Sequence, residues 1–299
     1  MERFTVRPDQ WPLWIRGFLP AAEPFFLAAG ETADALSAAG ELVYTRAELA
    51  ESFPRFRLDH GQAYVMGAIG ADSFVWLAGR AARNRVDRSL WARIRDEQGT
   101  NGRGQVYDGG WPLPAPDVPE EDRLPDGRWL LAPDTWQALG ADPRQRWLFE
   151  WLSRRLAEDQ PGHVDAEVAP RYRELVDRYA GTFADTSGPN CFSTALGMAL
   201  GRPADIFPLW LHPEPFLRTL RGNGFRPVDD PEPRPGDVVT WADVTGPLVH
   251  AAFCVGDGLL FNKNGQSWEQ PYAVVTLDDV RDFDGTLTAG GTMTVYRRA

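Results

Sequence analysis

The chain has 299 residues, of which 43% are hydrophobic and 12% aromatic, which is enough apolar material for one large domain or two smaller ones. Its formal net charge is −11, so it repels phosphate groups, and neither nucleic acid nor an anionic membrane is expected as its main partner. No stretch approaches the roughly 20 apolar residues of a membrane-spanning helix, and the N-terminus lacks the regions of a signal peptide. These features predict a cytoplasmic protein, unless a leader is missing or export follows another route.

The first 160 residues predict a mixed α/β domain of unassigned role. Short helices are expected between residues 10 and 29, and an irregular stretch with two short strands over 99–131. Thr45 is expected to cap a short helix. The remaining strands are expected at 4–7, 41–44, 63–66 and 73–77, and the remaining helices at 32–39, 86–98 and 142–157. A break at 159–163 marks the predicted domain boundary, which gives domains 1–160 and 161–299.

The order of strands and helices in this first half resembles the GNAT acetyltransferase family. That family holds the pyrophosphate of acyl-CoA on a glycine-rich loop at the start of a helix. Residues 80–85 occupy the corresponding position and contain no glycine. A structural or substrate-shaping domain is therefore expected here.

The second half predicts a helical segment followed by an antiparallel sheet, so the fold class is α+β. Glycine-rich turns at 256–258 and 264–265 separate short apolar runs, which is typical of hairpins. Helices are expected at 165–180, 191–201 and 213–221, and a short acidic helical turn after residue 277. Strands are expected at 225–228, 238–241, 250–255, 259–262, 273–277 and 292–296.

Cys191 is one of only two cysteines, and it lies where loop-forming residues give way to helix-forming ones. The first turn of a helix favours a thiolate, because its backbone N–H groups are unpaired and its dipole is positive there. Cys254 lies in an apolar strand and is expected in the core, although a bridge between the two cysteines is also open. No C-x-x-C spacing predicts a zinc site.

His250 and Asn262 are separated by a tight hairpin, so the two side chains are expected to face each other across neighbouring strands. Thiol chemistry needs a base near the sulfur and a polar group that orients the imidazole. Cys191, His250 and Asn262 supply these three groups. Asn264 has the same strand parity and is the alternative orienting residue.

Residues 165–299 resemble the NlpC/P60 branch of the papain-like cysteine hydrolases. The matching pieces are Asn190-Cys191-Phe192 at a helix start, the run Arg234-Pro-Gly-Asp-Val-Val-Thr-Trp241 and the run His250-Ala-Ala-Phe-Cys-Val-Gly-Asp-Gly258. The family usually shows Asp-Cys-Ser at the nucleophile, and often histidine as the third residue.

This resemblance implies a thiolate–imidazolium pair and an oxyanion site at the backbone N–H of Cys191. Asn190 either caps the helix or helps to polarise the substrate carbonyl. The implied substrate is a peptide, isopeptide or γ-glutamyl amide, including cell-wall peptides, and no cofactor or metal is implied. Transfer of the acyl group to an amine, or a non-catalytic binding role on the same scaffold, are the alternatives.

Other polar residues carry no functional prediction. His60, His163 and His212 lie beside loop-forming residues without metal-ligand spacing, so surface positions are expected. Lys263 is the single lysine among 31 basic residues, a bias that base composition explains.

Overall fold

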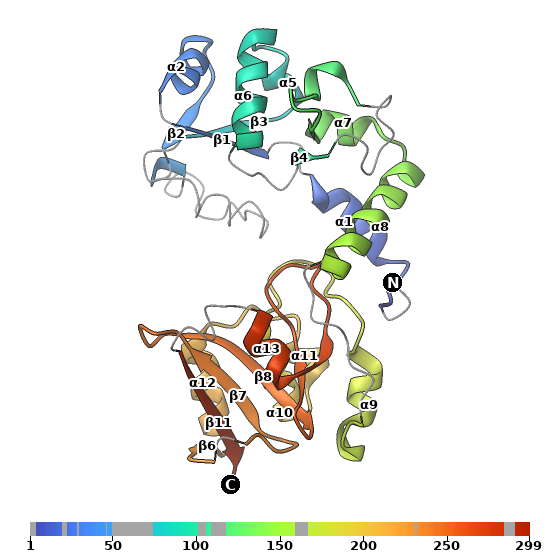
Figure 1. Cartoon of the computed structure of the whole chain (residues 1–299), viewed down its shortest axis with the longest axis vertical. Helices are drawn as coiled ribbons and strands as arrows, with labels where there is room; N and C mark the ends of the chain where they lie inside the picture. The colour runs from blue at the N-terminus through green and yellow to red at the C-terminus, as the bar shows by residue number, and fades with distance from the viewer. Residues whose placement is uncertain are drawn as a thin grey trace. The chain divides into compact units, whose positions relative to one another are not determined.

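The computed structural model describes residues 4–19, 23–28, 30–45, 47–49, 74–100, 106–108, 118–158, 167–230, 232–283 and 291–299. The chain forms two compact units, one of Trp11–Trp151 and one of Met1–Gln10 together with Leu152–Ala299. They are called the N-terminal and C-terminal units below (Figure 1). The predicted boundary after residue 160 falls in 159–166, outside the described residues. None of the described helices is long and apolar enough to cross a membrane.

The N-terminal unit contains a three-stranded antiparallel sheet in the order β1-β3-β2 and a two-stranded ladder of β4 and β5. The buried side chains of β1, β3, α2 and α6 form one hydrophobic cluster. The elements of this unit are α1 (Gln10–Phe18), β1 (Glu23–Leu27), α2 (Glu31–Ala38), β2 (Val43–Thr45), β3 (Phe74–Ala78), α5 (Arg80–Arg83), α6 (Arg88–Thr100), β4 (Val106–Tyr107), η2 (Glu120–Asp122), β5 (Trp129–Leu130), α7 (Pro133–Ala138) and the start of α8 (Ala141–Glu158).

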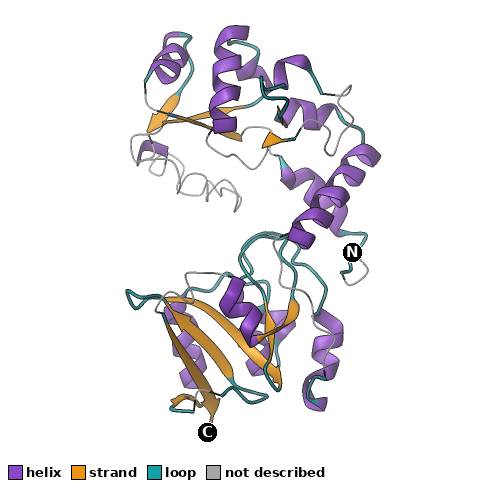
Figure 2. Cartoon of the chain, viewed as in Figure 1, coloured by secondary structure: helices purple, strands orange, loops and turns teal. Residues whose placement is uncertain are grey.

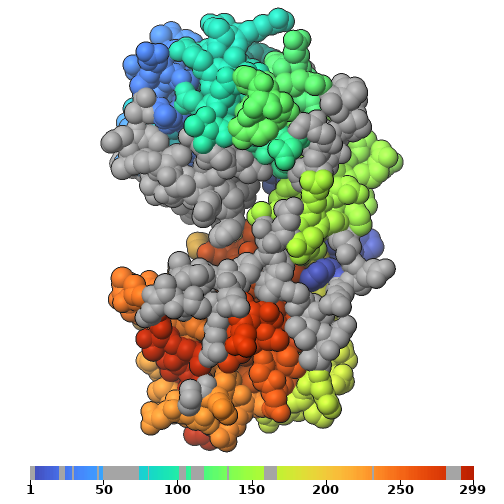
Figure 3. All heavy atoms as spheres, in the orientation of Figure 1, coloured from blue at the N-terminus to red at the C-terminus, as the bar shows by residue number. Residues whose placement is uncertain are grey.

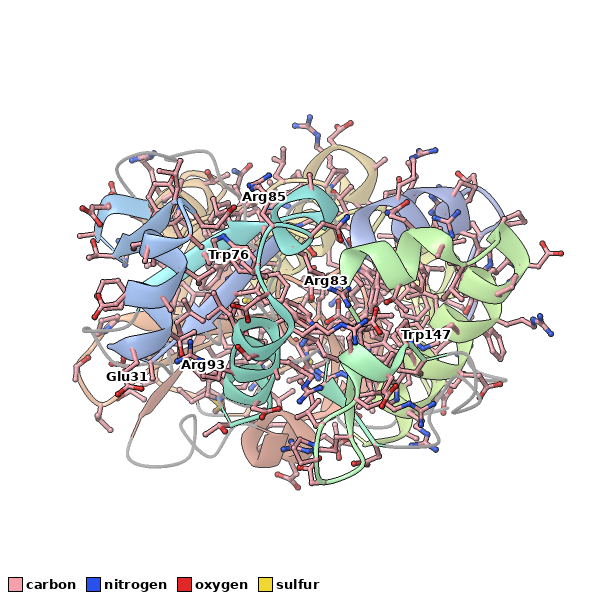
Figure 4. The ribbon with its side chains drawn as sticks, turned by 90° about the horizontal axis from the view of Figure 1, so that it is seen from above. Glu31, Trp76, Arg83, Arg85, Arg93 and Trp147 are labelled. Carbon is pink, nitrogen blue, oxygen red and sulfur yellow. The ribbon has the colours of Figure 1, made fainter. Side chains whose placement is uncertain are left out.

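Two buried carboxylates organise polar groups inside this unit. Three of the side chains that bind them, Trp76, Arg83 and Arg85, are labelled in Figure 4. Glu41 accepts hydrogen bonds from the Trp76 indole, at 3.2 Å, and from the Arg85 guanidinium. Asp122 pairs with Arg83 and accepts a hydrogen bond from Thr135. Such pairing is what allows charged groups to be buried at low cost.

The sequence prediction for the first residues is wrong in two places. Residues 4–7 form no strand, and the Thr5 N–H donates to the Gly181 carbonyl at 2.8 Å. Residues 23–27 form strand β1 instead of helix, at the edge of its sheet. An edge strand tolerates Pro24, which has no N–H to donate to a neighbour. The predicted strand at 63–66 lies outside the described residues.

The C-terminal unit is built on a six-stranded antiparallel sheet in the order β10-β9-β8-β7-β11-β6 (Figure 2). The helices before it are α9 (Pro170–Tyr179), α10 (Cys191–Leu200), α11 (Pro203–Ile206) and α12 (Pro213–Gly222). The sheet comprises β6 (Phe225–Val228), β7 (Val238–Ala242), β8 (Leu248–Gly256), β9 (Leu259–Asn262), β10 (Ala273–Thr276) and β11 (Thr292–Arg298), with α13 (Leu277–Phe283) before β11. All six predicted strands are present, and β6 lies at the edge as its Pro227 requires.

The sheet buries apolar side chains on both faces, because successive residues of a strand point to opposite sides. Ala251, Phe253 and Phe261 belong to the cluster that packs against α9, α10, α11 and α12. Cys254 and Leu260 belong to a second cluster, which includes Val280 of α13. In Figure 3 the face of this unit turned to the viewer is mostly orange to red, so it is built largely from residues that follow α12. The structure is therefore mixed α and β with antiparallel sheets.

Candidate active site

Cys191 is the first residue of helix α10, and the sequence explains why the helix begins there. Asn190 is the N-cap in extended conformation: its side chain accepts from the Ser193 N–H at 3.1 Å, while the Ser193 hydroxyl accepts from the Asn190 N–H at 3.1 Å. This reciprocal capping box satisfies backbone donors that have no partner inside the helix. Gly201 ends the helix with φ 65°, a left-handed conformation that favours glycine.

Both ends of the Asn190 side-chain amide are bonded within the protein. Besides the cap made by its oxygen, its Nδ2 donates to the Leu211 carbonyl at 2.7 Å. The residue is 5% exposed. One of the two N–H groups of Nδ2 is thus used by Leu211, and the capping role uses Asn190 as it stands.

His250 lies in β8, is 7% exposed, and has its ring centroid 5.5 Å from that of Trp241 on the neighbouring strand β7. Its Nε2 lies 2.9 Å from the side-chain oxygen of Asn262. The pairing of Phe253 with Phe261 places Asn262 opposite the residue two positions after His250, on the same side of the ladder. The hairpin thus joins the two side chains diagonally.

Asn264 completes this arrangement, since its side-chain oxygen accepts a hydrogen bond from Asn262 Nδ2. That bond fixes which end of the Asn262 amide faces the imidazole. Because an amide oxygen only accepts, His250 Nε2 must carry the hydrogen. In the neutral ring Nδ1 is then the nitrogen that takes up a proton. Asn262 touches the ring directly, and Asn264 orients Asn262.

The backbone N–H groups of Ala251 and Phe192 favour the negative form of the Cys191 sulfur and so lower its pKa, and Ala251 directly follows His250. Burial raises the pKa of the Cys191 thiol to about 11, although these N–H groups and the charge of Lys263 act in the opposite direction. The helix start therefore favours the thiolate as expected, but desolvation has the larger effect. In the absence of other molecules, Cys191 is a protonated thiol at neutral pH.

Cys254 lies in a different environment in the same strand as His250. It is fully buried, and its thiol donates to the Gly256 carbonyl at 3.1 Å. Burial raises the pKa of this thiol to about 12. Both cysteines are free thiols, so they form no bridge.

A groove of about 620 Å³ lies between α12 and the sheet. It does not include Cys191, His250 or Asn262. Two of its residues connect it to the site, because Thr240 pairs with Ala251 across the ladder and Leu248 precedes His250 by two positions. The lining also contains Pro213, Glu214, Leu217, Arg218, Arg221, Ala242, Gly246, Thr292, Thr294 and Tyr296.

The other histidines stand apart from this arrangement as far as the structure describes them. His212 is the N-cap residue of α12, with its ring centroid 5.2 Å from that of Trp210. His60 and His163 lie outside the described residues. Within the described part of the chain, no group of three or more His, Cys, Asp or Glu side chains is placed to hold a metal ion.

Sequence reasoning missed Lys263, which is fully buried next to Asn262. Its signal was present, because it is the single lysine of the chain and it directly follows a predicted site residue. No local pattern indicated that Lys263 is buried, since lysine is among the residues least often found inside a protein.

Comparisons of the chain with protein-family models, with curated proteins and with solved structures find no match.

Proposed function

We propose that residues 161–299 form a papain-like cysteine hydrolase domain of the NlpC/P60 type, which cleaves a peptide, isopeptide or γ-glutamyl amide. The observation that carries this proposal is the oriented His250–Asn262 pair, with Nε2 and Oδ1 2.9 Å apart and the amide held by Asn264. It makes Nδ1 the basic nitrogen of a histidine whose next residue, Ala251, lowers the pKa of the Cys191 thiol through its backbone N–H. A nucleophile, a base and an orienting group are the minimum set for acyl transfer through a thioester.

The reaction follows from these roles. In the proposed reaction His250 Nδ1 takes the thiol proton as the Cys191 sulfur attacks the substrate carbonyl. This step requires the imidazole, which lies on the face of the sheet that carries Trp241, to reach a sulfur that packs on the face of Ala251. The oxygen becomes an anion, which the backbone N–H of Cys191 stabilises. The C–N bond then breaks, His250 gives the proton to the leaving amine, and a thioester remains. A water molecule, deprotonated by His250, hydrolyses that thioester and restores the thiol.

The raised pKa of Cys191 assigns His250 the role of a general base at the moment of attack. A buried thiol with a pKa of about 11 does not hold a standing negative charge at neutral pH. This differs from the preformed thiolate–imidazolium pair that the family resemblance implies. Substrate binding next to the sulfur changes its surroundings, and in this proposal proton transfer to the imidazole accompanies attack.

The test uses both cysteines of the intact chain. Iodoacetamide is expected to label Cys191 faster than Cys254, and His250→Gln is expected to slow labelling of Cys191 alone. A panel of peptidyl and γ-glutamyl coumarin amides then tests turnover, with Cys191→Ala as the inactive control. Equal, slow labelling of both thiols, unaffected by His250→Gln, would contradict the proposal.

A second candidate function is a binding protein on the same scaffold, and one observation favours it. Cys191 is only 7% exposed, and its thiol is strongly protonated. A protein that has the fold of the hydrolase but no catalytic activity would be expected to show a buried and protonated cysteine at this position. Trapping a thioester on Cys191 by mass spectrometry, after mixing with the same amides, decides for the hydrolase; binding of an amide without acylation decides for this alternative.

A further inference from the structure

Lys263 is a buried amino group that the proposed reaction does not use. Its side chain is fully buried, and Nζ donates to the carbonyls of Ser267 at 2.7 Å and Gln270 at 2.9 Å. Nζ also lies 5.9 Å from the centroid of the Tyr272 ring. Lys263 therefore ties together the loop 264–270, called the site loop below, from inside.

The site loop contacts the chain just before Cys191. The Gly188 N–H donates to the Gln266 carbonyl at 2.7 Å, and the Trp268 N–H donates to the Ser187 hydroxyl at 3.3 Å. At its other end the loop begins with Asn264, which holds Asn262. One loop thus connects the segment that leads to the nucleophile with the residues that orient the base.

We propose that Lys263 is a positioning residue of this site: by binding two carbonyls of the site loop, its buried amino group holds Asn264 and Asn262 against His250 and so selects the Nε2–H tautomer. The inference rests on the proposed function for its catalytic meaning, whereas the tautomer itself is a property of the folded protein. The covalent geometry supports it, since Asn262, Lys263 and Asn264 are consecutive and a shift of the loop moves all three.

The charge of Lys263 is a secondary part of its role. Burial lowers the pKa of its amino group to about 7, while Glu269 and Cys191 act in the other direction. Below that pKa the group is a cation that favours a negative sulfur at Cys191. Above it, the neutral amine still has two N–H groups, one for each carbonyl. The loop therefore stays tied on both sides of neutral pH, and only the electrostatic effect changes.

The experiment compares Lys263→Met with Ser187→Ala in the full chain. Lys263→Met removes both donors and the charge at similar side-chain length. Ser187→Ala removes one contact of the same loop and leaves Lys263 unchanged, so it controls for general loosening. The first readout is the tautomer of His250 from its ¹⁵N chemical shifts, assigned with a His250→Gln sample. The second is the rate at which iodoacetamide labels Cys191.

We expect the wild type and Ser187→Ala to show His250 with the hydrogen on Nε2. In Lys263→Met we expect a mixture of tautomers and labelling of Cys191 slowed by about tenfold or more, because small misplacements of reacting groups have large effects on rate. A folded Lys263→Met variant with the wild-type tautomer and labelling rate overturns the proposal. So does Ser187→Ala if it disturbs the tautomer equally.

A second variant covers the case in which Lys263→Met does not fold. Lys263→Gln keeps an N–H₂ donor but has no charge, and we expect it to retain the Nε2–H tautomer of His250. A mixture of tautomers in this folded variant would mean that the charge of Lys263, and not its hydrogen bonds, selects the tautomer, which would contradict the proposal. Because Lys263 is the single lysine, ¹⁵N-lysine labelling yields one amino signal. None of these readouts needs turnover, so a protein that cleaves no amide would overturn the proposed function and leave this test intact.

Discussion

The two buried cysteines show how similar side chains acquire different chemistry within one unit. Cys191 starts a helix, and its sulfur meets backbone N–H groups and the field of Lys263. Cys254 lies in mid-strand, donates to the Gly256 carbonyl, and is surrounded by apolar side chains. Burial raises the pKa of both thiols, but groups that stabilise a negative sulfur are concentrated at Cys191. The two cysteines differ more in their position, at the start of a helix or within a strand, than in their burial.

The polar groups near each cysteine sharpen the contrast. His250, Asn262 and Lys263 are nearly or fully buried and Asn264 is half-buried, and hydrogen bonds link His250 to Asn262 and Asn262 to Asn264. Burying polar groups is costly unless each one is bonded. Such a concentration in one place is typical of a functional site, whereas the cluster around Cys254 is a hydrophobic core.

The largest expected effect is the difference in amide turnover between variants of the two cysteines. Cys191→Ala should lower amide turnover by about 1,000-fold or more, because removing a nucleophile leaves only binding and oxyanion stabilisation. Cys254→Ala should leave turnover nearly unchanged. The measurement is the initial rate with the best substrate of the coumarin amide panel. Comparable losses in both variants would mean that the two thiols are not functionally distinct.

The next effect concerns the orientation of the base. Asn262→Ala should lower turnover by about 10-fold to 100-fold, because the imidazole loses the group that selects its tautomer. Asn264→Ala should have a smaller effect in the same direction. Steady-state rates of the two variants, with unchanged circular dichroism, test the order. A larger loss of turnover in Asn264→Ala than in Asn262→Ala would mean that Asn264, and not Asn262, orients the imidazole directly.

Damage to the cluster around Cys254 should affect stability alone. Val275→Ala removes buried methyl groups from that cluster and should lower the free energy of unfolding by about 2 kcal/mol. Urea denaturation measures this loss. Iodoacetamide labelling should become faster at Cys254 and stay unchanged at Cys191. A changed rate at Cys191 would show that the two environments are coupled.

The pH dependence of labelling compares the two thiols directly. Only the thiolate reacts, so labelling rates should rise with pH towards pKa values of about 11 for Cys191 and about 12 for Cys254. At a given pH below both values, this difference alone makes the thiolate fraction about tenfold larger at Cys191. Peptide mapping after timed labelling between pH 7 and 10 checks it. A midpoint for Cys191 below neutral pH would instead indicate a preformed thiolate.

The same pKa shifts have a consequence for stability. A thiol whose pKa is raised in the folded state stabilises the fold while it is protonated, and this contribution is lost as pH rises above the pKa of the unfolded chain. The melting temperature should therefore fall as pH rises from about 8.5, the ordinary value for cysteine. Cys191→Ala should weaken that dependence, and an identical pH profile in this variant would speak against burial as the cause.

The smallest effect belongs to the helix that carries Cys191. Asn190→Ala removes the N-cap and should lower the free energy of unfolding by about 1 kcal/mol. Asn190→Ser keeps a capping hydroxyl and loses only the bond to the Leu211 carbonyl. Chemical denaturation should order the variants as wild type, Ser, Ala. If the Ser variant is as unstable as the Ala variant, the bond to Leu211 is the important one.

Local patterns in the sequence predicted the helices and strands of the C-terminal unit. Glycine-rich turns and apolar runs indicated all six strands, and the change from loop-forming to helix-forming residues placed Cys191 at the start of α10. Hydrogen bonding between near neighbours, as in the capping box of Asn190 and Ser193, depends on spacing along the chain. The short hairpin likewise brought His250 and Asn262 together, since only twelve positions separate them. Where a partner is distant, as for residues 4–7 and β1, the sequence prediction was wrong.

The electrostatics of the site and the hydrogen bonds that connect its residues depend on three-dimensional packing. The pKa of Cys191 depends on how completely other elements exclude water from the sulfur, and that outweighed the local effect of the helix start. The division of roles between Asn262 and Asn264, which share strand parity, depends on where the site loop folds. In the sequence, the presence of a single lysine was explained by base composition, whereas in the structure Lys263 is a fully buried hydrogen-bond donor. Burial arises from packing among distant segments, so these three features could not be predicted from local pattern.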